Sequence, residues 1–321
     1  MFKVIDLPPE GKPEETEGLD RVCPPPAGTI RWIDLVETDK AALDVLGQRF
    51  GFHPLALEDC ASFELQSKLE EYDNFLFIVL HTITADPDDP SDVQIHEVHA
   101  FLTETTLVTV HDNRIDAQEL AWRRALTDET FLRHGPDWAL HRTADVMVDA
   151  IFPLLEAIAD ELEEVEDSIV RGGAGGDLAR IFQIKRSLVK MRRVIRPLRD
   201  VIGILTRRQG DPRIRERTAV YFRDVHDHTL RCAETIEEDL ALASHAMDAY
   251  RSAISNRTNE VVKRLTIVSA IFLPLMFLTG FWGQNFTTLP FSTDAVFYVM
   301  LGTMLALPVG MYLWFKGRGL L

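Results

Sequence analysis

The chain has 321 residues, and its 34 Lys and Arg against 50 Asp and Glu give a formal net charge of -16. This charge argues against a nucleic-acid binder, which needs basic side chains to replace the counterions of the phosphates. Three scattered cysteines are too few for a disulfide framework or a four-cysteine zinc site. The mean hydropathy of -0.03 is ordinary for a soluble protein, but the charges along the chain are unevenly distributed.

The first 140 residues have a mixed pattern that predicts a small cytoplasmic domain of strands and helices. Runs rich in β-branched and aromatic residues predict strands at 29–35, 74–84, 96–103 and 106–111. Helices are predicted at 39–50 and 54–60. We therefore take residues 1–140 as one domain.

Residues 141–210 predict an antiparallel helical hairpin. Apolar residues recur every three or four positions at 151–169 and again at 181–205, on either side of the glycine run 172–176. The first helix is acidic and the second basic, so we expect opposite charges to face each other, although one exposed pair contributes only about 0–1 kcal/mol. Two alternatives are a nucleic-acid patch for the basic run and a phosphate loop for the glycines, but no Lys-Ser or Lys-Thr follows them.

A third helix is predicted over 211–283, and it runs without interruption into an apolar segment. The chain from Lys263 onward carries a net charge of +3, against -19 for the residues before it. The uncharged runs 265–281 and 295–315 are each long enough to cross a hydrocarbon core of about 30 Å. A pair of buried core helices is the alternative, but basic residues at the ends of both runs favour membrane spans.

Basic residues also predict the orientation of these spans. Lys263 and Arg264 precede the first span, Lys316 and Arg318 follow the second, and the loop 284–294 has neither Lys nor Arg. By the positive-inside rule, the protein lies in the cell membrane with two spans, an extracytoplasmic loop at 284–294 and a basic cytoplasmic tail at 316–321. Both termini are then cytoplasmic, and the first 20 residues lack the apolar core of a signal peptide.

One face of the third helix combines polar, small and bulky apolar side chains. At 100° per residue, eight positions fall within roughly 100° of one another. These positions are Asp248, Asn259, Val262, Thr266, Ser269, Leu273, Met276 and Gly280. The stripe fits either close helix packing through small residues or a pore lining. Because two helices cannot enclose a water-filled path, a pore requires several subunits.

Residues 280–286, Gly-Phe-Trp-Gly-Gln-Asn-Phe, resemble the end of the first span in the CorA metal-ion transporters, whose signature is Gly-Met-Asn. Residues 53–59, 70–72, 221–228 and 255–260 also match, so the resemblance covers nearly the whole chain. It implies an α+β cytoplasmic domain followed by long α-helices and two C-terminal transmembrane helices. It also implies a funnel-shaped homopentamer in the lipid bilayer whose first spans line the pore.

The function implied by this resemblance is a channel for divalent cations, with Mg²⁺ influx first and Co²⁺ or Ni²⁺ as further cations. The outer mouth is assigned to Gly283, Gln284 and Asn285, whose neutral oxygens can hold hydrated Mg²⁺ without trapping it. Gln284 replaces the Met of the signature and adds a second amide. Because relatives that move Zn²⁺ also vary this position, the identity of the ion stays open.

The resemblance also assigns inner and regulatory positions. Asp248 and Asn259 match polar rings of the pore, and Leu273 and Met276 match hydrophobic gate positions. Asp224 matches a carboxylate that binds regulatory Mg²⁺ together with a carboxylate from the α/β domain of the neighbouring subunit. We choose Asp86, after the strand at 74–84, as that partner; a solvated surface charge is the alternative for each acid.

The histidines and the remaining motifs do not favour an enzyme. His96 and His99 should lie on opposite faces of a strand, and His226 and His228 are two apart on a helix and should not share a ligand. A metal site in the soluble domain is therefore disfavoured, although His228 lies one turn from Asp224. Without a nucleophile–base pattern or a nucleotide loop, an ATP-driven pump is unfavoured too. Two alternatives remain, a Zn²⁺ transporter coupled to protons and a non-conducting, metal-sensing membrane scaffold.

Overall fold

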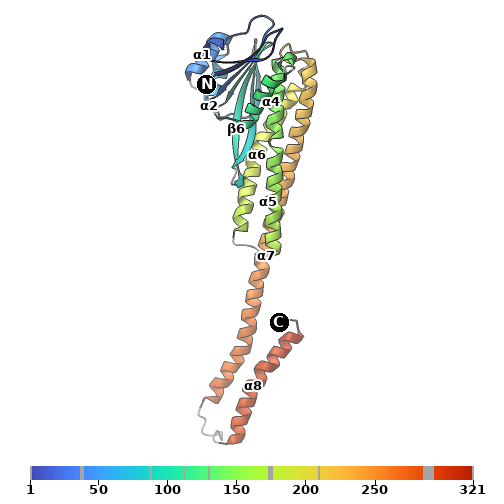
Figure 1. Cartoon of the computed structure of the whole chain (residues 1–321). Helices are drawn as coiled ribbons and strands as arrows, with labels where there is room; N and C mark the ends of the chain where they lie inside the picture. Colours follow the sequence, from blue (N-terminus) through green and yellow to red (C-terminus); the bar gives the residue numbers. More distant parts are fainter. Residues whose placement is uncertain are drawn as a thin grey trace. The chain divides into compact units, whose positions relative to one another are not determined.

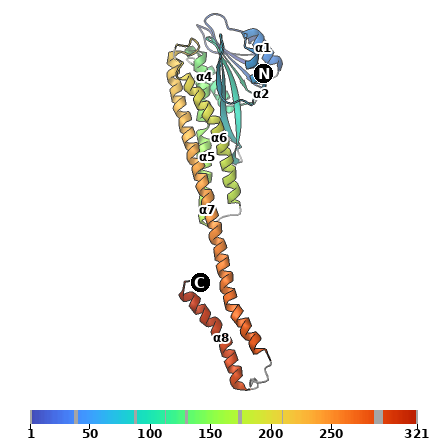
Figure 2. The ribbon, with the colours of Figure 1, turned by 180° about the vertical axis from the view of Figure 1, so that it is seen from behind.

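The computed structural model describes residues 2–36, 40–86, 89–111, 113–128, 131–172, 176–208, 210–284 and 293–319. By its internal contacts the chain divides into two compact units, Met1–Met247 and Asp248–Leu321. The long helix α7, Glu216–Trp282, contributes to both. Figures 1 and 2 show the ribbon from opposite sides.

The first unit contains a seven-stranded sheet with the strand order β2-β1-β3-β7-β6-β5-β4. Only the central pair β3 and β7 is parallel, and all the other neighbours are antiparallel. The strands are β1 Phe2–Leu7, β2 Glu14–Glu17, β3 Ile30–Val36, β4 Lys68–Glu71, β5 Leu76–Asp86, β6 Asp89–Leu102 and β7 Thr106–His111.

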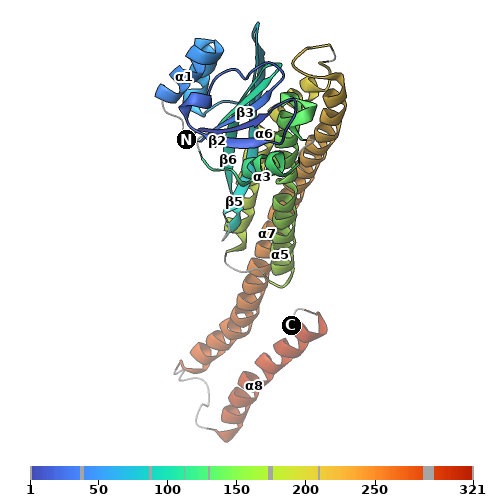
Figure 3. The ribbon, with the colours of Figure 1, turned by 45° about the horizontal axis from the view of Figure 1, so that its top comes forward.

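Helices cover both faces of this sheet, which explains why its inner strands are buried almost throughout. Two helices, α1 Lys40–Phe50 and α2 Pro54–Ser62, close a small core over one face. The larger core on the other face is covered by α3 Asp116–Thr127, α4 Pro136–Asp149, α5 Phe152–Val170, α6 Asp177–Leu205 and part of α7 (Figure 3). Residues on alternate sides of β5, such as Phe77 and Ile78, enter different cores.

The strands and helices predicted in the first domain are confirmed, but the prediction was incomplete. The sequence does not predict strands β1, β2 and β4 or helices α3 and α4. β2 and β4 form the two edges of the sheet, and their Glu-rich sequences EETE and KLEE carry no apolar pattern. The domain boundary expected at residue 140 falls inside α4.

The hairpin of α5 and α6 is confirmed, and opposite charges do pair across it at Arg180, but the basic side chains farther along the described part of α6 do not pair with α5. Of the α6 side chains, it is Arg180 that forms ion pairs with α5, at 3.3 Å from Glu161 and 3.1 Å from Glu164. Farther along α6, Arg192 and Arg196 instead contact Glu237 of α7, at 3.5 and 2.6 Å. The apolar seam occupies the contact between α5 and α6, so most of their charges lie on other faces.

A dense ion-pair network fixes the loop before α7 to the edge of the sheet. The Arg213 guanidinium donates to the carbonyl oxygens of Tyr72 and Phe75, at 2.8 and 3.1 Å, and it pairs with Glu71 and Asp211. Burial favours the neutral form of Asp211, but hydrogen bonds from Arg213 and Arg208 lower its pKa to about 2. The loop is therefore held to the turn between β4 and β5.

The second unit consists of the C-terminal part of α7 and of α8, Asp294–Gly317, which turns back in the opposite direction (Figures 1 and 2). Both helices are long and apolar enough to cross a membrane. Large apolar side chains such as Leu273 and Phe277 on α7, and Leu305 and Leu313 on α8, are 61–70% exposed. The spans predicted at 265–281 and 295–315 lie within these helices, and α7 continues through Pro274.

Asp239 is a buried acid in the apolar seam of α7. Its side chain is 7% exposed, and its Oδ2 atom has no hydrogen-bond partner among the described residues. Burial, together with the neighbouring charge of Glu238, raises its pKa from an ordinary 3.8 to about 6. Folding thus favours the protonated acid, so the contribution of Asp239 to stability is fully present below about pH 4 and is lost as the pH rises through about 6.

Replacing Asp239 by Asn should therefore stabilise the protein at neutral pH. A shift of about two pKa units corresponds to about 3 kcal/mol at most, and we expect about 1–3 kcal/mol because the buried amide still lacks partners. Thermal unfolding in detergent should give a higher melting temperature for Asp239→Asn at pH 7.5 and about half of that gain at pH 5, where the acid is ionised in the unfolded chain but protonated in the folded one. The substitution Asp227→Asn, at an exposed acid of the same helix, is the control. An equal gain at both pH values would contradict the assignment.

Candidate metal centre

Two pairs of side chains on facing helices form the candidate site in the first unit. Asp145 comes from α4, and Asp224 and His228 come from one turn of α7. One ligand atom of each of these three residues lies within 4.8 Å of the others. Asp149, one turn beyond Asp145, places its Oδ1 3.0 Å from Nδ1 of His228. Both pairs are four residues apart, the spacing that puts side chains on the same helix face.

The four side chains differ in their exposure to solvent. The side chain of Asp145 is 12% exposed and His228 is 21% exposed, whereas Asp149 and Asp224 are 53% and 70% exposed. Burial raises the pKa of Asp145, Asp149 and Asp224 add to the rise, and Arg142, whose Nη1 lies 2.7 Å from Asp145 Oδ2, opposes it. The carboxylates of Asp145, Asp149 and Asp224 are thus concentrated beside the Arg142 guanidinium. The side of the cluster that carries Asp149 and Asp224 is open to solvent.

This donor set fits a divalent cation. Carboxylate oxygens are the ligands that Mg²⁺ prefers, and the exposed side leaves room for the waters that Mg²⁺ keeps. An imidazole nitrogen adds a ligand that suits Co²⁺, Ni²⁺ or Zn²⁺ better than Mg²⁺. A bound cation would screen the repulsion among the carboxylates and favour the ionised form of Asp145.

The cluster contains one of the two regulatory residues predicted from the sequence. Asp224 is present, but Asp86 is not among the residues of the cluster. Asp86 ends β5, and Asp89, at the start of β6, accepts a hydrogen bond of 2.5 Å from Gln183 of α6. Pairing of Asp86 with Asp224 across two subunits therefore stays a prediction.

Sequence reasoning missed Asp145 and gave His228 too little weight. The pair Asp224 and His228 is visible in the sequence as an i,i+4 spacing, and so is Asp145 with Asp149. Only the packing of α4 against α7 shows that the two pairs face each other. His226, as expected, is not part of the cluster.

The predicted pore residues lie in the second unit, on the part of α7 that begins at Asp248. Along the stripe, Val262, Leu273 and Met276 are 55–68% exposed. Oδ1 of Asp248 lies 3.7 Å from Nη1 of Arg251, and the hydroxyl of Thr266 donates to the Val262 carbonyl within its own helix. Exposed apolar and polar side chains of the stripe are thus available to other chains.

The predicted outer mouth is only partly described. Gly283 donates its backbone N–H to the Thr279 carbonyl at 2.9 Å, which closes the last turn of α7. Gln284 follows as a bend, with its N–H 3.3 Å from the Phe281 carbonyl. Asn285 lies outside the described residues. The roles assigned to the mouth stay predictions.

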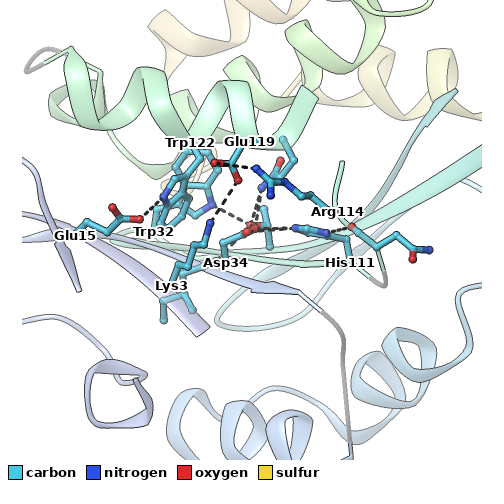
Figure 4. Close-up of polar contacts among 12 residues, drawn as sticks. Lys3, Glu15, Trp32, Asp34, His111, Arg114, Glu119 and Trp122 are labelled. Carbon is cyan, nitrogen blue, oxygen red and sulfur yellow. Dashed lines mark hydrogen bonds and ion pairs between the residues drawn. The ribbon is translucent and has the colours of Figure 1, made fainter. Parts of the chain in front are cut away.

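A second polar cluster in the first unit is structural. Asp34 accepts hydrogen bonds from Thr109, from Gln118 at 2.9 Å and from Nε2 of His111 at 3.2 Å, while Nδ1 of His111 faces the Asn113 carbonyl. Figure 4 shows the Asp34 carboxylate and the His111 ring pointing toward each other. Burial alone raises the pKa of Asp34, but His111 lowers it below its ordinary value. Both ring nitrogens of His111 are thus engaged within the protein, and neither is available as a metal ligand.

The chain thus combines a cluster of candidate cation ligands in its first unit with two long, exposed apolar helices, each able to cross a membrane, in its second unit. The family model described as CorA-like Mg2+ transporter protein matches residues 27–317. The chain belongs to this family.

Individual relatives resemble the chain over most of its length. The cobalt/magnesium transport protein CorA of Thermotoga maritima is 34% identical over 295 residues, which are 91% of this chain and 84% of that protein. The putative metal ion transporter YfjQ of Bacillus subtilis is 32% identical over 289 residues, 90% of this chain and 89% of that protein. The structure of the CorA magnesium transporter from Methanocaldococcus jannaschii has a TM-score of 0.83 at 20% identity, and the match covers 98% of this chain and 97% of that chain. The last match indicates the same fold.

Removing a carboxylate from the cluster should weaken cation binding without unfolding the domain. We expect that 10 mM Mg²⁺ or Co²⁺, about tenfold above the dissociation constant of the weakest protein Ca²⁺ sites, raises the melting temperature of the full chain. The rise should be lost in Asp224→Asn and in Asp145→Asn. Asp227→Asn removes an exposed acid of the same helix and should keep the rise. A full rise in Asp224→Asn would contradict the metal centre.

Proposed function

We propose that the chain forms a homopentameric channel of the cell membrane, with both termini in the cytoplasm, that passes divalent cations and Mg²⁺ first among them. The observation that carries the proposal is the exposed apolar surface of α7 and α8 in a member of a cation transporter family. Members of this family are channels and transporters, so the chain is a transporter and not an enzyme.

The stripe on α7 would line the path of the ion. Two helices cannot surround water, and five copies placed around an axis would bring five stripes together. Leu273 and Met276 would then form hydrophobic constrictions, and Asn259 and Asp248 polar rings. Backbone and amide oxygens at Gly283, Gln284 and Asn285 would hold the hydrated cation at the outer mouth. Such neutral oxygens suit Mg²⁺, which gives up its water reluctantly.

The metal centre would sense the cation that accumulates in the cytoplasm. With a cation bound, Asp145, Asp224 and His228 would be held together, and the packing of α4 on α7 would be stabilised. When the cation leaves, three carboxylates repel one another beside a buried seam. The cation would bind the closed conformation more tightly than the open one. A rising cytoplasmic concentration of the cation would thus favour the closed conformation.

Flux into liposomes tests the outer mouth. Asn285→Ala should reduce Mg²⁺ uptake at least tenfold, because the amide that would hold the hydrated ion is removed, as measured with a Mg²⁺-sensitive dye. Asn256→Ala removes an amide from α7 outside the stripe and should leave uptake within twofold of the wild type. Undiminished uptake by Asn285→Ala would refute the assignment of the mouth.

A Zn²⁺ transporter coupled to protons is the second candidate. Two observations favour it, the imidazole of His228 in the metal centre and Gln284 in place of the signature's Met. A non-conducting, metal-sensing scaffold is the third.

Competitive uptake of Mg²⁺, Co²⁺, Ni²⁺ and Zn²⁺, with and without a pH gradient, separates these functions. We expect Mg²⁺ uptake that does not change with the pH gradient, because a channel needs only the electrochemical gradient of the ion. Uptake of Zn²⁺ that requires a pH gradient would support the second candidate. A scaffold would give no uptake in any gradient, although the cation would still protect the Asp224 region from proteolysis.

A further inference from the structure

Two rows of opposite charge run along the outer faces of α5 and α6. The acidic row consists of Glu156, Asp160 and Glu163, and the basic row consists of Arg186, Lys190 and Arg193. Both rows have the spacing i, i+4, i+7, so each forms a straight stripe on its helix. Lys190 is half-exposed and the other five side chains are exposed.

These six side chains have no ion pair or hydrogen bond with any residue in the described part of the chain. The same bundle satisfies other charges at similar positions. Arg192 and Arg196, on the α7 side of α6, both contact Glu237. Glu161 and Glu164 of α5 contact Arg180. The two rows are therefore the charges left over after α5, α6 and α7 have packed together.

The two rows overlap in height where Glu156 and Arg186 begin them, extend from there in opposite directions, and point away from each other. Glu161 faces Arg180, and Ser168 donates to Asp177 at 2.9 Å, which fixes the register of the two antiparallel helices. Counting back from these contacts puts Arg186 level with Glu156 and within about one turn of Asp160. Arginine is long enough to reach a carboxylate on an adjacent helix, so the missing ion pair means that the rows face different sides.

We infer that the acidic row on α5 of one subunit docks against the basic row on α6 of the next. This inference rests on the proposed ring of subunits. A closed ring uses two different surfaces of each subunit, one for each neighbour, and these surfaces must be complementary. Rotation about an axis along the bundle keeps the height of every residue, so Glu156 of one copy would meet Arg186 of its neighbour, with Asp160 and Lys190 each about one turn from that pair.

The occupant is therefore a second copy of this chain. Charge pairs of this kind contribute little individually in water, but they fix the register and the order of the partners. Repeated around a ring, they would make α5 and α6 alternate on the outside of the bundle. Because the pairs are exposed, their contribution should decrease at high salt.

Charge reversal of each row tests the interface. Both E156K/D160K/E163K and R186E/K190E/R193E should place like charges opposite each other and dissociate the pentamer. Native mass spectrometry of the full chain in detergent at low salt should show half-dissociation at a protein concentration at least tenfold above that of the wild type. The variant that carries all six substitutions has opposite charges again. Its concentration at half-dissociation should return to within twofold of the wild-type value. The control E10K/E14K/E17K makes the same change of charge on exposed residues elsewhere and should have no effect.

Cysteine cross-linking gives a direct test of proximity. The chain carrying Asp160→Cys and the chain carrying Arg186→Cys are co-expressed in a Cys23→Ser background, because Cys60 and Cys232 are buried. A disulfide-linked dimer from the mixture, and none from either chain alone, is expected. If the wild type is pentameric but neither reversal dissociates it and no cross-link forms, the inference fails and the ring stands. If the wild type is not a ring, the proposed function fails as well.

Discussion

A backbone that leaves water must satisfy its N–H and C=O groups within its own helix, and this constraint shapes the C-terminal half of the chain. It explains why α7 continues through its apolar C-terminal stretch, where Pro274 interrupts one hydrogen bond without ending the helix. The large apolar side chains of that stretch are exposed, as a helix surrounded by lipid requires. Two helices of one chain enclose no path for an ion, so the proposed conduction requires several copies.

The candidate metal centre depends on the same helix. Asp224 and His228, which meet Asp145 of α4, are part of α7, as is the stripe proposed to line the pore. One element therefore carries both candidate cation ligands and the residues proposed to line the path of the ion. The acidity of the chain has a corresponding division. Some carboxylates hold a candidate cation, others are neutralised by arginines such as Arg180 and Arg213, and those of the α5 row remain available to a neighbour.

The sequence predicted most of the helices and the inner strands because their signals are strong and local. β5 and β7 are continuous runs of apolar and β-branched residues, and α5 and α6 keep a regular apolar seam. β2 and β4 were invisible because edge strands need only backbone pairing, and their side chains are mostly glutamate and lysine. Asp145 could not be found because its partners are almost 80 residues away in the chain. The partners of most basic side chains of α6 could not be predicted, because a sequence gives the sign of a charge but not the helix that its side chain faces.

The network at Arg213 has a mechanical consequence. Its guanidinium is joined to the turn between β4 and β5 by two backbone carbonyls and a carboxylate, and α7 begins three residues later. A joint with so many hydrogen bonds has little freedom to bend. Displacement of the sheet edge would therefore be delivered to α7 as a rotation or translation of the helix rather than absorbed by a flexible linker. A movement of the sheet edge would therefore displace the start of α7 as well.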